Sequence, residues 1–219
     1  MILYIVIETA ARYAANDYSR HKRALERTAG DLCLILHYKQ LRRPLIAALR
    51  PWAICYSGTS TPWREYGILR DRDFRDAVCR SRLPQLGICG GHQMIAHFFG
   101  GRVASMRPVG PLEADANPRY HAGSFKEWGV YPVHILQRDP LFAGLGPEIH
   151  VQEFHRDEVK ELGPMMIRLA ESDACRIQTF RHRRRPIYGV QFHPEEATSD
   201  YPDGLRVLRN FFRLARPKA

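Results

Sequence analysis

A cysteine set between glycines and a distant histidine followed by carboxylates are the residues of this sequence best suited to chemistry. Cys89 lies in segment 84–93, which reads PQLGICGGHQ, and His193 lies in segment 188–196, which reads YGVQFHPEE. A thiolate can attack a carboxyl or carboxamide carbon when a general base is close and a third group orients that base. Cys89, His193 and Glu195 are therefore a candidate nucleophile, base and orienting carboxylate.

The segment around Cys89 has the pattern of a nucleophile elbow. A short apolar run ends at the cysteine, and a second apolar segment, which reads as a helix, follows through Phe99. In a strand–turn–helix unit of this kind the turn exposes one side chain, and Gly87 and Gly91 remove Cβ atoms that would meet neighbouring backbone. The helix N-terminus favours thiolate over thiol. The alternative is a structural cysteine buried in an ordinary turn.

Taken together, the two segments resemble the class I (triad) glutamine amidotransferases. The patterns G-x-C-x-G-x-Q at 87–93 and F-H-P-E at 192–195 occur in that family's order, and the resemblance covers roughly residues 2–214. In its motifs the chain most resembles the glutaminase domain of GMP-synthase type. The resemblance implies that Cys89, His193 and Glu195 form the catalytic triad and that glutamine, or another γ-glutamyl compound, is hydrolysed through a γ-glutamyl thioester.

Hydrolysis of an amide also requires N–H donors that converge on the tetrahedral oxyanion. Gly90, directly after the nucleophile, offers one such N–H. The resemblance implies further donors at Gly58 and Thr59, within the segment 56–62. Thr59 stands where the family has a second glycine, and a β-branched residue disfavours positive φ. Either this loop adopts another conformation, or its donors align only when substrate binds, or the segment is a plain Ser/Thr turn.

The resemblance further implies three residues that hold the substrate. Gln93 lies one turn into the elbow helix, where its amide can offer a donor and an acceptor. Phe154 and His155 lie in the segment 152–157, whose backbone in the family meets the α-carboxylate and ammonium of glutamine. The alternatives are a helix-surface residue for Gln93 and a solvent-exposed loop histidine for His155.

Composition and length limit the other functions open to the chain. With 219 residues, 45% hydrophobic and 26% charged, the sequence suits a single domain spanning 1–219. No apolar run approaches the ~20 residues that cross a bilayer, and no signal peptide is expected. The five cysteines are scattered without metal-ligand spacing, which indicates reduced thiols and a cytoplasmic location.

Charge and motifs also bear on cofactors and partners. The net charge of +10 includes the basic run Arg181–Arg185, which we interpret as a turn between strands rather than a nucleic-acid site. We expect no metal, and neither a phosphate-binding loop nor a dinucleotide fingerprint is present. Because the chain shows no means of activating an acceptor with ATP, ammonia would pass to a separate ATP-dependent synthetase subunit.

The elements that must position these residues follow an α/β pattern. Apolar runs alternate with amphipathic stretches, which predicts a doubly wound, mostly parallel sheet with flanking helices in a flavodoxin-like sandwich. Residues 102–118 read as irregular. The predicted strands are 2–7, 32–38, 53–56, 86–88, 128–136, 148–152, 165–170, 175–180 and 186–191. The predicted helices are 17–28, 41–49, one that includes 74–82, the elbow helix through Phe99, and 201–214.

The sequence leaves three functions open. The first is a glutaminase that supplies ammonia to a synthetase. The second is a γ-glutamyl peptide or amide hydrolase of the same superfamily. The third, of another class, is a non-catalytic regulatory or binding module, against which the intact triad of Cys89, His193 and Glu195 argues.

Overall fold

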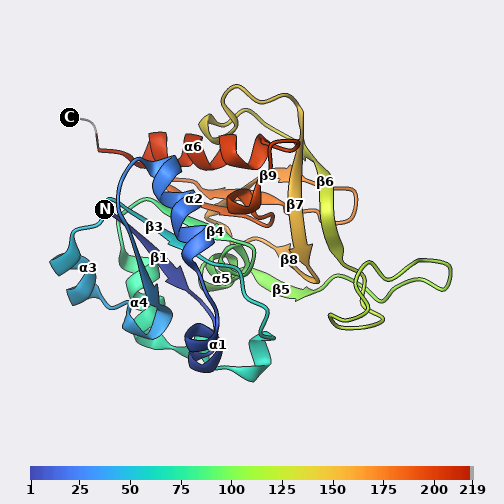
Figure 1. Cartoon of the computed structure of the whole chain (residues 1–219), viewed down its shortest axis with the longest axis horizontal. Helices are drawn as coiled ribbons and strands as arrows, with labels where there is room; N and C mark the ends of the chain where they lie inside the picture. Colours follow the sequence, from blue (N-terminus) through green and yellow to red (C-terminus); the bar gives the residue numbers. More distant parts are fainter. Residues whose placement is uncertain (218–219) are drawn as a thin grey trace.

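A nine-stranded mixed sheet forms the centre of the molecule (Figure 1). The computed structural model describes residues 1–217. The strand order is β2-β1-β3-β4-β11-β10-β9-β6-β7, and a separate pair is formed by β5 and β8. The strands are β1 (Ile2–Val6), β2 (Cys33–His37), β3 (Ala53–Tyr56), β4 (Gln85–Ile88), β5 (Arg102–Ser105), β6 (Glu127–Ile135), β7 (Glu148–His155), β8 (Asp157–Glu161), β9 (Met166–Glu171), β10 (Thr179–His182) and β11 (Ile187–Val190).

The sheet has a parallel half and an antiparallel half. Strands β2, β1, β3, β4 and β11 run parallel to their neighbours, whereas β11, β10, β9, β6 and β7 pair antiparallel. Strands β1, β3, β4 and β11 are completely buried, as their continuous apolar runs require, whereas the edge strand β2 is partly exposed. The predicted fold class is confirmed, and antiparallel strands extend the parallel core.

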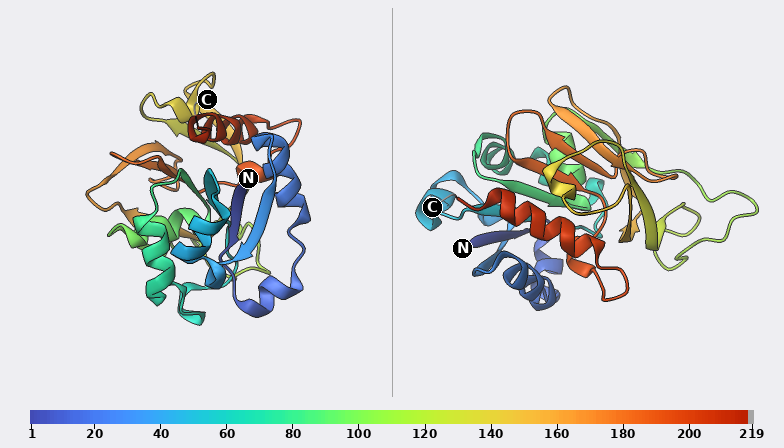
Figure 2. Two further views of the ribbon diagram at one scale, coloured as in Figure 1. Left: turned by 90° about the vertical axis from the view of Figure 1, so that its left-hand side faces the viewer. Right: turned by 90° about the horizontal axis from the view of Figure 1, so that it is seen from above.

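Helices cover both faces of the parallel half (Figure 2). One apolar cluster joins α2 and α6 to one face, and a second joins α3, α4 and α5 to the other. On α6, Val207, Leu208, Phe211 and Phe212 recur at helical spacing and are all buried. The helices are α1 (Ala10–Ala15), α2 (Ser19–Ala29), α3 (Arg43–Leu49), α4 (Arg72–Arg80), α5 (Gly90–Phe98) and α6 (Asp203–Ala215), with short 3₁₀ turns between them.

Two sequence predictions need correction, and one helix was missed. Residues 102–118 are not wholly irregular, because Arg102–Ser105 forms β5 and pairs with β8. The strand predicted at 175–180 begins only at Thr179 and runs to His182. Helix α1 was not predicted, and none of its residues is buried. In each case the element depends on distant partners or on few contacts, so the local apolar pattern carries little signal.

The basic run Arg181–Arg185 spans the turn between β10 and β11. Arg181 Nε pairs with Asp139 Oδ2 at 2.9 Å, and Arg185 donates to the Cys79 carbonyl at 2.6 Å and to the Ser81 carbonyl. Arg185 therefore satisfies carbonyls at the end of α4. Among residues 1–217, no helix is long and apolar enough to cross a membrane.

Candidate active site

Cys89 occupies a strained turn between β4 and α5. Its φ of 49° and ψ of −105° fall in a region that residues with a side chain rarely adopt. Its N–H donates to the Val190 carbonyl at 2.8 Å, which ties the turn to β11. A Cβ on Gly87 would lie 2.4 Å from the Gly91 carbonyl oxygen, and one on Gly91 would lie 2.7 Å from the Tyr56 carbonyl oxygen. The glycines on both sides of Cys89 therefore permit the sharp turn that the sequence predicted.

His193 lies beside Cys89 because their strands are neighbours. Strand β11 runs parallel to β4 with Val190 opposite Ile88, so both side chains follow adjacent strand ends. A Cβ built on Gly58 would lie 2.9 Å from His193 Cε1 and 3.5 Å from the Cys89 Cβ. Gly58 thus lies beside both groups, and any side chain there would displace the His193 ring.

Glu195 orients the His193 ring. Its Oε1 lies 2.8 Å from His193 Nδ1, which leaves Nε2 for the cysteine side. Burial alone would lower the pKa of His193, but the Glu195 carboxylate and the Cys89 sulfur raise this pKa well above its ordinary value. The structure brings Cys89, His193 and Glu195 together in the arrangement expected of a nucleophile, its base and an orienting carboxylate.

The predicted oxyanion loop adopts a conformation that accommodates threonine. Neither Gly58 nor Thr59 has a positive φ, so the β-branched side chain causes no backbone strain. The Thr59 hydroxyl accepts the Thr61 N–H at 3.1 Å and lies 3.1 Å from the Tyr66 hydroxyl. The departure at Thr59 therefore causes no backbone strain, and the alignment of the loop's N–H donors on an oxyanion stays a prediction.

Thr59 packs closely against Gly90. A Cβ built on Gly90 would fall 2.8 Å from the Thr59 nitrogen. Within residues 1–217, neither the Gly90 N–H nor the Thr59 N–H donates a hydrogen bond to the protein. Two N–H groups without a partner among the described residues are available beside the nucleophile, and their donation to an oxyanion stays a prediction.

A cavity of about 270 Å³ opens over Cys89, His193 and Glu195. Its size suits a small ligand such as an amino acid rather than a dinucleotide. Aromatic rings form one wall: the centroids of Tyr120 and Trp128 are 5.3 Å apart, those of Trp128 and Phe154 are 5.3 Å apart, and those of Phe154 and His193 are 5.6 Å apart. Phe154 thus lies in the cavity wall, and its contact with substrate stays a prediction.

The helix-surface alternative for Gln93 is wrong. This residue is buried, and it is not among the described residues that line the cavity. Its amide donates to the Asp157 carbonyl at 2.6 Å and to Gln191 Oε1 at 3.1 Å, and its oxygen accepts the Trp63 indole N–H at 3.2 Å. Gln191 in turn lies 3.6 Å from the Cys89 sulfur. The Gln93 amide is therefore engaged within the protein behind the nucleophile, and its contact with substrate stays a prediction.

His155 also differs from its prediction, because it is neither exposed nor in the cavity wall. It is 2% exposed at the end of β7, and its Nε2 lies 2.8 Å from Glu127 Oε2 and 3.2 Å from Glu153 Oε2. Burial alone would lower the pKa of His155, but hydrogen bonds to these two carboxylates raise it well above its ordinary value. His155 therefore anchors the strand that carries Phe154, and the solvent-exposed alternative is wrong.

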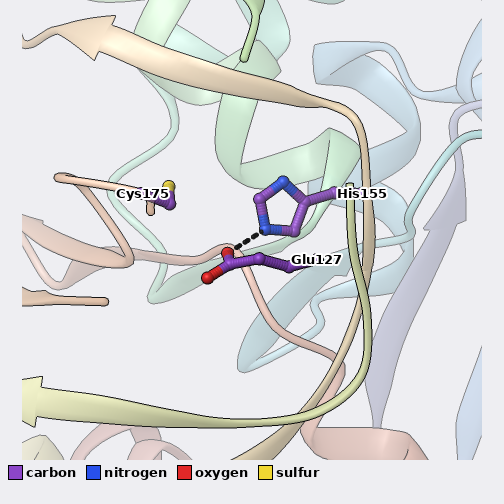
Figure 3. Close-up of side chains that lie close together, drawn as sticks. All are labelled: Glu127, His155 and Cys175. Atoms are coloured by element: carbon purple, nitrogen blue, oxygen red, sulfur yellow. Dashed lines mark hydrogen bonds and ion pairs between the residues drawn. The ribbon is translucent and has the colours of Figure 1, made fainter. Parts of the chain in front are cut away.

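Glu127, His155 and Cys175 form a cluster of metal-ligand types that the spacing in the sequence did not reveal (Figure 3). Their ligand atoms all lie within 4.8 Å of one another. However, the Glu127 carboxylate already accepts the Ser172 hydroxyl at 2.6 Å and the Gln178 amide at 2.8 Å as well as His155.

A metal ion would need a deprotonated thiol and a neutral imidazole in this cluster. Burial, followed by the charge of Glu127, raises the pKa of Cys175 well above its ordinary value. Although burial alone would lower the pKa of His155, hydrogen bonds to Glu127 and Glu153 raise this pKa well above its ordinary value, which opposes the neutral imidazole that a metal requires. The donor set fits a hydrogen-bonded proton network rather than a metal site, so we assign it a structural role.

Sequence reasoning missed Glu8, which follows β1 and lines the cavity. A carboxylate directly after a buried apolar strand was a usable signal, because ligands bind at the carboxyl ends of parallel strands. It also missed Tyr120 and Trp128, which come from the segment preceding β6 and from β6 itself. For Tyr120 the local sequence, rich in Pro and polar residues, offered no such signal.

A strained cysteine on a strand–helix elbow, facing a histidine–glutamate pair, places the chain among α/β proteins with a Cys–His–Glu triad. The family model for glutamine amidotransferase class-I matches residues 57–215. The chain belongs to this family, and the resemblance inferred from the two motifs is confirmed.

Known proteins of GMP-synthase type are similar to the chain. The glutamine-hydrolyzing GMP synthase subunit of Pyrococcus abyssi is 42% identical over 132 residues, which cover 60% of each chain. The Archaeoglobus fulgidus protein of the same name is 39% identical over 134 residues, covering 61% of this chain and 63% of that one. The matched part thus spans about three fifths of the length of these relatives.

Solved structures extend the similarity over nearly the whole chain. A Thermoplasma acidophilum protein assigned as one subunit of GMP synthase shares 26% identity with a TM-score of 0.75, covering 98% of this chain and 94% of that one. A glutamine amidotransferase of Thermotoga maritima shares 16% identity with a TM-score of 0.71, covering 98% and 97%, and shows the fold alone.

Proposed function

We propose that the chain is a glutaminase that hydrolyses the side-chain amide of glutamine and supplies the ammonia to a separate ATP-dependent synthetase subunit. The observation that carries this proposal is the alignment of Cys89, His193 and Glu195 in an amino-acid-sized cavity. The relatives' names, which describe a glutamine-hydrolysing subunit of GMP synthase, support it. We also propose that 1–219 is a single amidotransferase domain and that it acts in the cytoplasm.

The proposed reaction begins when the Cys89 thiolate attacks the γ-carboxamide carbon. The carbonyl oxygen becomes an oxyanion, which accepts hydrogen bonds from the Gly90 and Thr59 N–H groups. The His193 imidazolium then donates a proton from Nε2 to the leaving nitrogen, so that the C–N bond breaks and ammonia departs. A γ-glutamyl thioester remains on Cys89.

Water completes the cycle. Neutral His193 accepts a proton from water as its oxygen attacks the thioester carbon, and the C–S bond breaks to release glutamate and the thiolate. Glu195 holds the ring through Nδ1 in both halves and stabilises the imidazolium. The unpaired N–H groups of Gly90 and Thr59 would serve both tetrahedral intermediates.

The second candidate is a γ-glutamyl peptide or amide hydrolase. The aromatic wall of Tyr120, Trp128 and Phe154 favours this candidate, because such a wall can also hold a leaving group larger than ammonia. A regulatory module is disfavoured, since binding alone would not require a strained cysteine beside a histidine–glutamate pair.

The purified chain tests these functions directly. We expect it to release ammonia from glutamine in preference to cleaving γ-glutamyl peptides, and we expect an ATP-dependent GMP synthetase partner to raise the rate. Cys89→Ala is the matched control for both substrates. Fast cleavage of peptides with little preference for free glutamine would refute the amidotransferase and support the hydrolase.

A further inference from the structure

The loop that carries the proposed oxyanion donors is bound to a buried carboxylate at the end of β1. Glu8 is 5% exposed, and its Oε1 accepts the Ser60 N–H at 2.6 Å and the Ser60 hydroxyl at 3.0 Å. Its Oε2 accepts the Thr61 hydroxyl at 2.5 Å. Hydrogen bonds to an ionised acceptor are about twice as strong as neutral ones. Glu8 thus holds the two residues that directly follow Thr59.

The end of β1 also contacts the loop on its other side. The Ile7 N–H donates to the Ser57 hydroxyl at 3.0 Å, and the Tyr66 hydroxyl lies 2.8 Å from the Ile7 carbonyl oxygen and 3.1 Å from the Thr59 hydroxyl. Strand β1 is completely buried and pairs with β2 and β3. It is therefore a fixed reference against which Gly58 and Thr59 are held.

Glu8 lines the cavity, so a direct role toward substrate has to be weighed. Both of its oxygens already accept hydrogen bonds from Ser60 and Thr61, which leaves the carboxylate turned toward the loop. A carboxylate without these donors would repel an oxyanion formed nearby. The geometry is that of a group that fixes the loop, and the ordered loop is what presents the donors.

We propose that Glu8 is a positioning residue that fixes the loop 58–61, so that the Thr59 N–H faces the oxyanion position before substrate binds. The inference rests on the proposed function and names a further residue for it. By fixing the loop, Glu8 would affect the tetrahedral intermediates, because these need the loop's N–H donors. It would not affect formation of the Cys89 thiolate, because that depends on His193. A loss of Glu8 should therefore slow acyl transfer while leaving simple alkylation of Cys89 unchanged.

Three variants of the full chain separate this role from a general effect on folding. Glu8→Ala removes the acceptors, Glu8→Gln keeps an oxygen for the Ser60 N–H, and Glu161→Ala removes an exposed carboxylate elsewhere as a control. We expect Glu8→Ala to lower kcat for glutamine about 100-fold, the scale of losing one oxyanion donor, with KM little changed. Glu8→Gln should recover most of that loss, and Glu161→Ala should match the wild type.

Alkylation of Cys89 by iodoacetamide provides the contrasting measurement, because displacement of iodide forms no oxyanion. We expect equal alkylation rates in all variants. Equal loss of alkylation and hydrolysis in Glu8→Ala would overturn the proposal, since it would indicate damage to the fold or the triad. Unchanged kcat in Glu8→Ala would overturn it as well.

Hydrogen exchange tests the same proposal without relying on glutaminase activity. Because the Ser60 N–H donates to Glu8, Glu8→Ala should speed amide exchange across 58–61, while exchange in β4 stays unchanged. Unchanged exchange in that loop would overturn the proposal even in an active enzyme. A wild-type chain that releases no ammonia, yet shows the expected exchange difference, would refute the proposed function and leave the role of Glu8 in ordering the loop supported.

Discussion

The strained backbone at Cys89 should show itself as an unusual response to glycine. At φ 49° and ψ −105° a side chain costs about 1–3 kcal/mol, which glycine would release. Glycine in place of alanine also loses a buried Cβ, at about 0.8 kcal/mol, and costs about 0.5–1 kcal/mol in backbone entropy. The opposing effects nearly cancel, so we expect Cys89→Gly to be as stable as Cys89→Ala within about 1 kcal/mol.

A second alanine-to-glycine comparison provides the control. Ala96 is fully buried in the same helix α5 and has no positive φ, so Ala96→Gly should lose about 1.5–2 kcal/mol without any compensating release of strain. Urea unfolding of Cys89→Ala, Cys89→Gly, Ala96→Gly and the wild type gives both differences. For a chain of this length, each kcal/mol corresponds to about 2–4 °C in Tm. If glycine costs as much at 89 as at 96, the elbow is not strained and the reasoning is refuted.

Three further predictions concern the triad, the buried carboxylates and the cavity wall. Cys89→Ser and Cys89→Ala should abolish glutamine hydrolysis, measured as kcat/KM, and His193→Ala should lower kcat/KM about as much. The loss of kcat/KM in Glu195→Ala should be at least about tenfold smaller. A larger loss at Glu195 than at His193 would place the base elsewhere. Burial raises the pKa of Glu153 to about 7. Between about pH 4.3, where the unfolded chain loses this proton, and about pH 7, the folded protein still binds it. The free energy of unfolding should therefore fall by at most about 4 kcal/mol as pH rises through this range. Glu153→Gln should flatten that part of the curve of unfolding free energy against pH, and an unchanged slope would contradict the shift. Tyr120→Ala should lower the ratio of kcat/KM for γ-glutamyl-p-nitroanilide to that for glutamine about tenfold, because it removes an aromatic surface that can hold the larger leaving group. Tyr120→Phe, which keeps the ring, should leave the ratio unchanged. Equal ratios in all three proteins would mean that Tyr120 does not contact the leaving group.

The sequence was most informative where chemistry and strand ends coincide. Cys89 and His193 each follow a short apolar run, and parallel strands align their carboxyl ends, so adjacent strands β4 and β11 bring the two side chains together. The parallel core was predicted for the same reason, because strands buried on both faces read as continuous apolar runs. In this half of the molecule the local sequence pattern is therefore enough to predict where a residue lies in the fold.

The antiparallel half was harder to predict because its pairings are distant in sequence. Strands β5 and β8 are short, and most of their residues are not fully buried, so neither has a clear alternation of apolar residues. The association of Glu127, His155 and Cys175 depends on three separate segments, and no spacing rule relates them. The sequence pattern consequently placed His155 in the substrate loop, whereas its ring belongs to the buried support of β7.

The two halves of the sheet therefore contribute different parts of the site. The ends of β1, β3, β4 and β11 supply the residues proposed for chemistry and its support: Glu8, Gly58 and Thr59, Cys89, and His193. The antiparallel half supplies the wall, through Trp128 on β6 and Phe154 on β7. Since hydrolysis needs the first set and the choice of amide depends on the second, exchanging wall residues should alter which γ-glutamyl compound is cleaved while the triad continues to form its thioester. Tyr120, outside both sets of strands, is the position where such a change would disturb the sheet least.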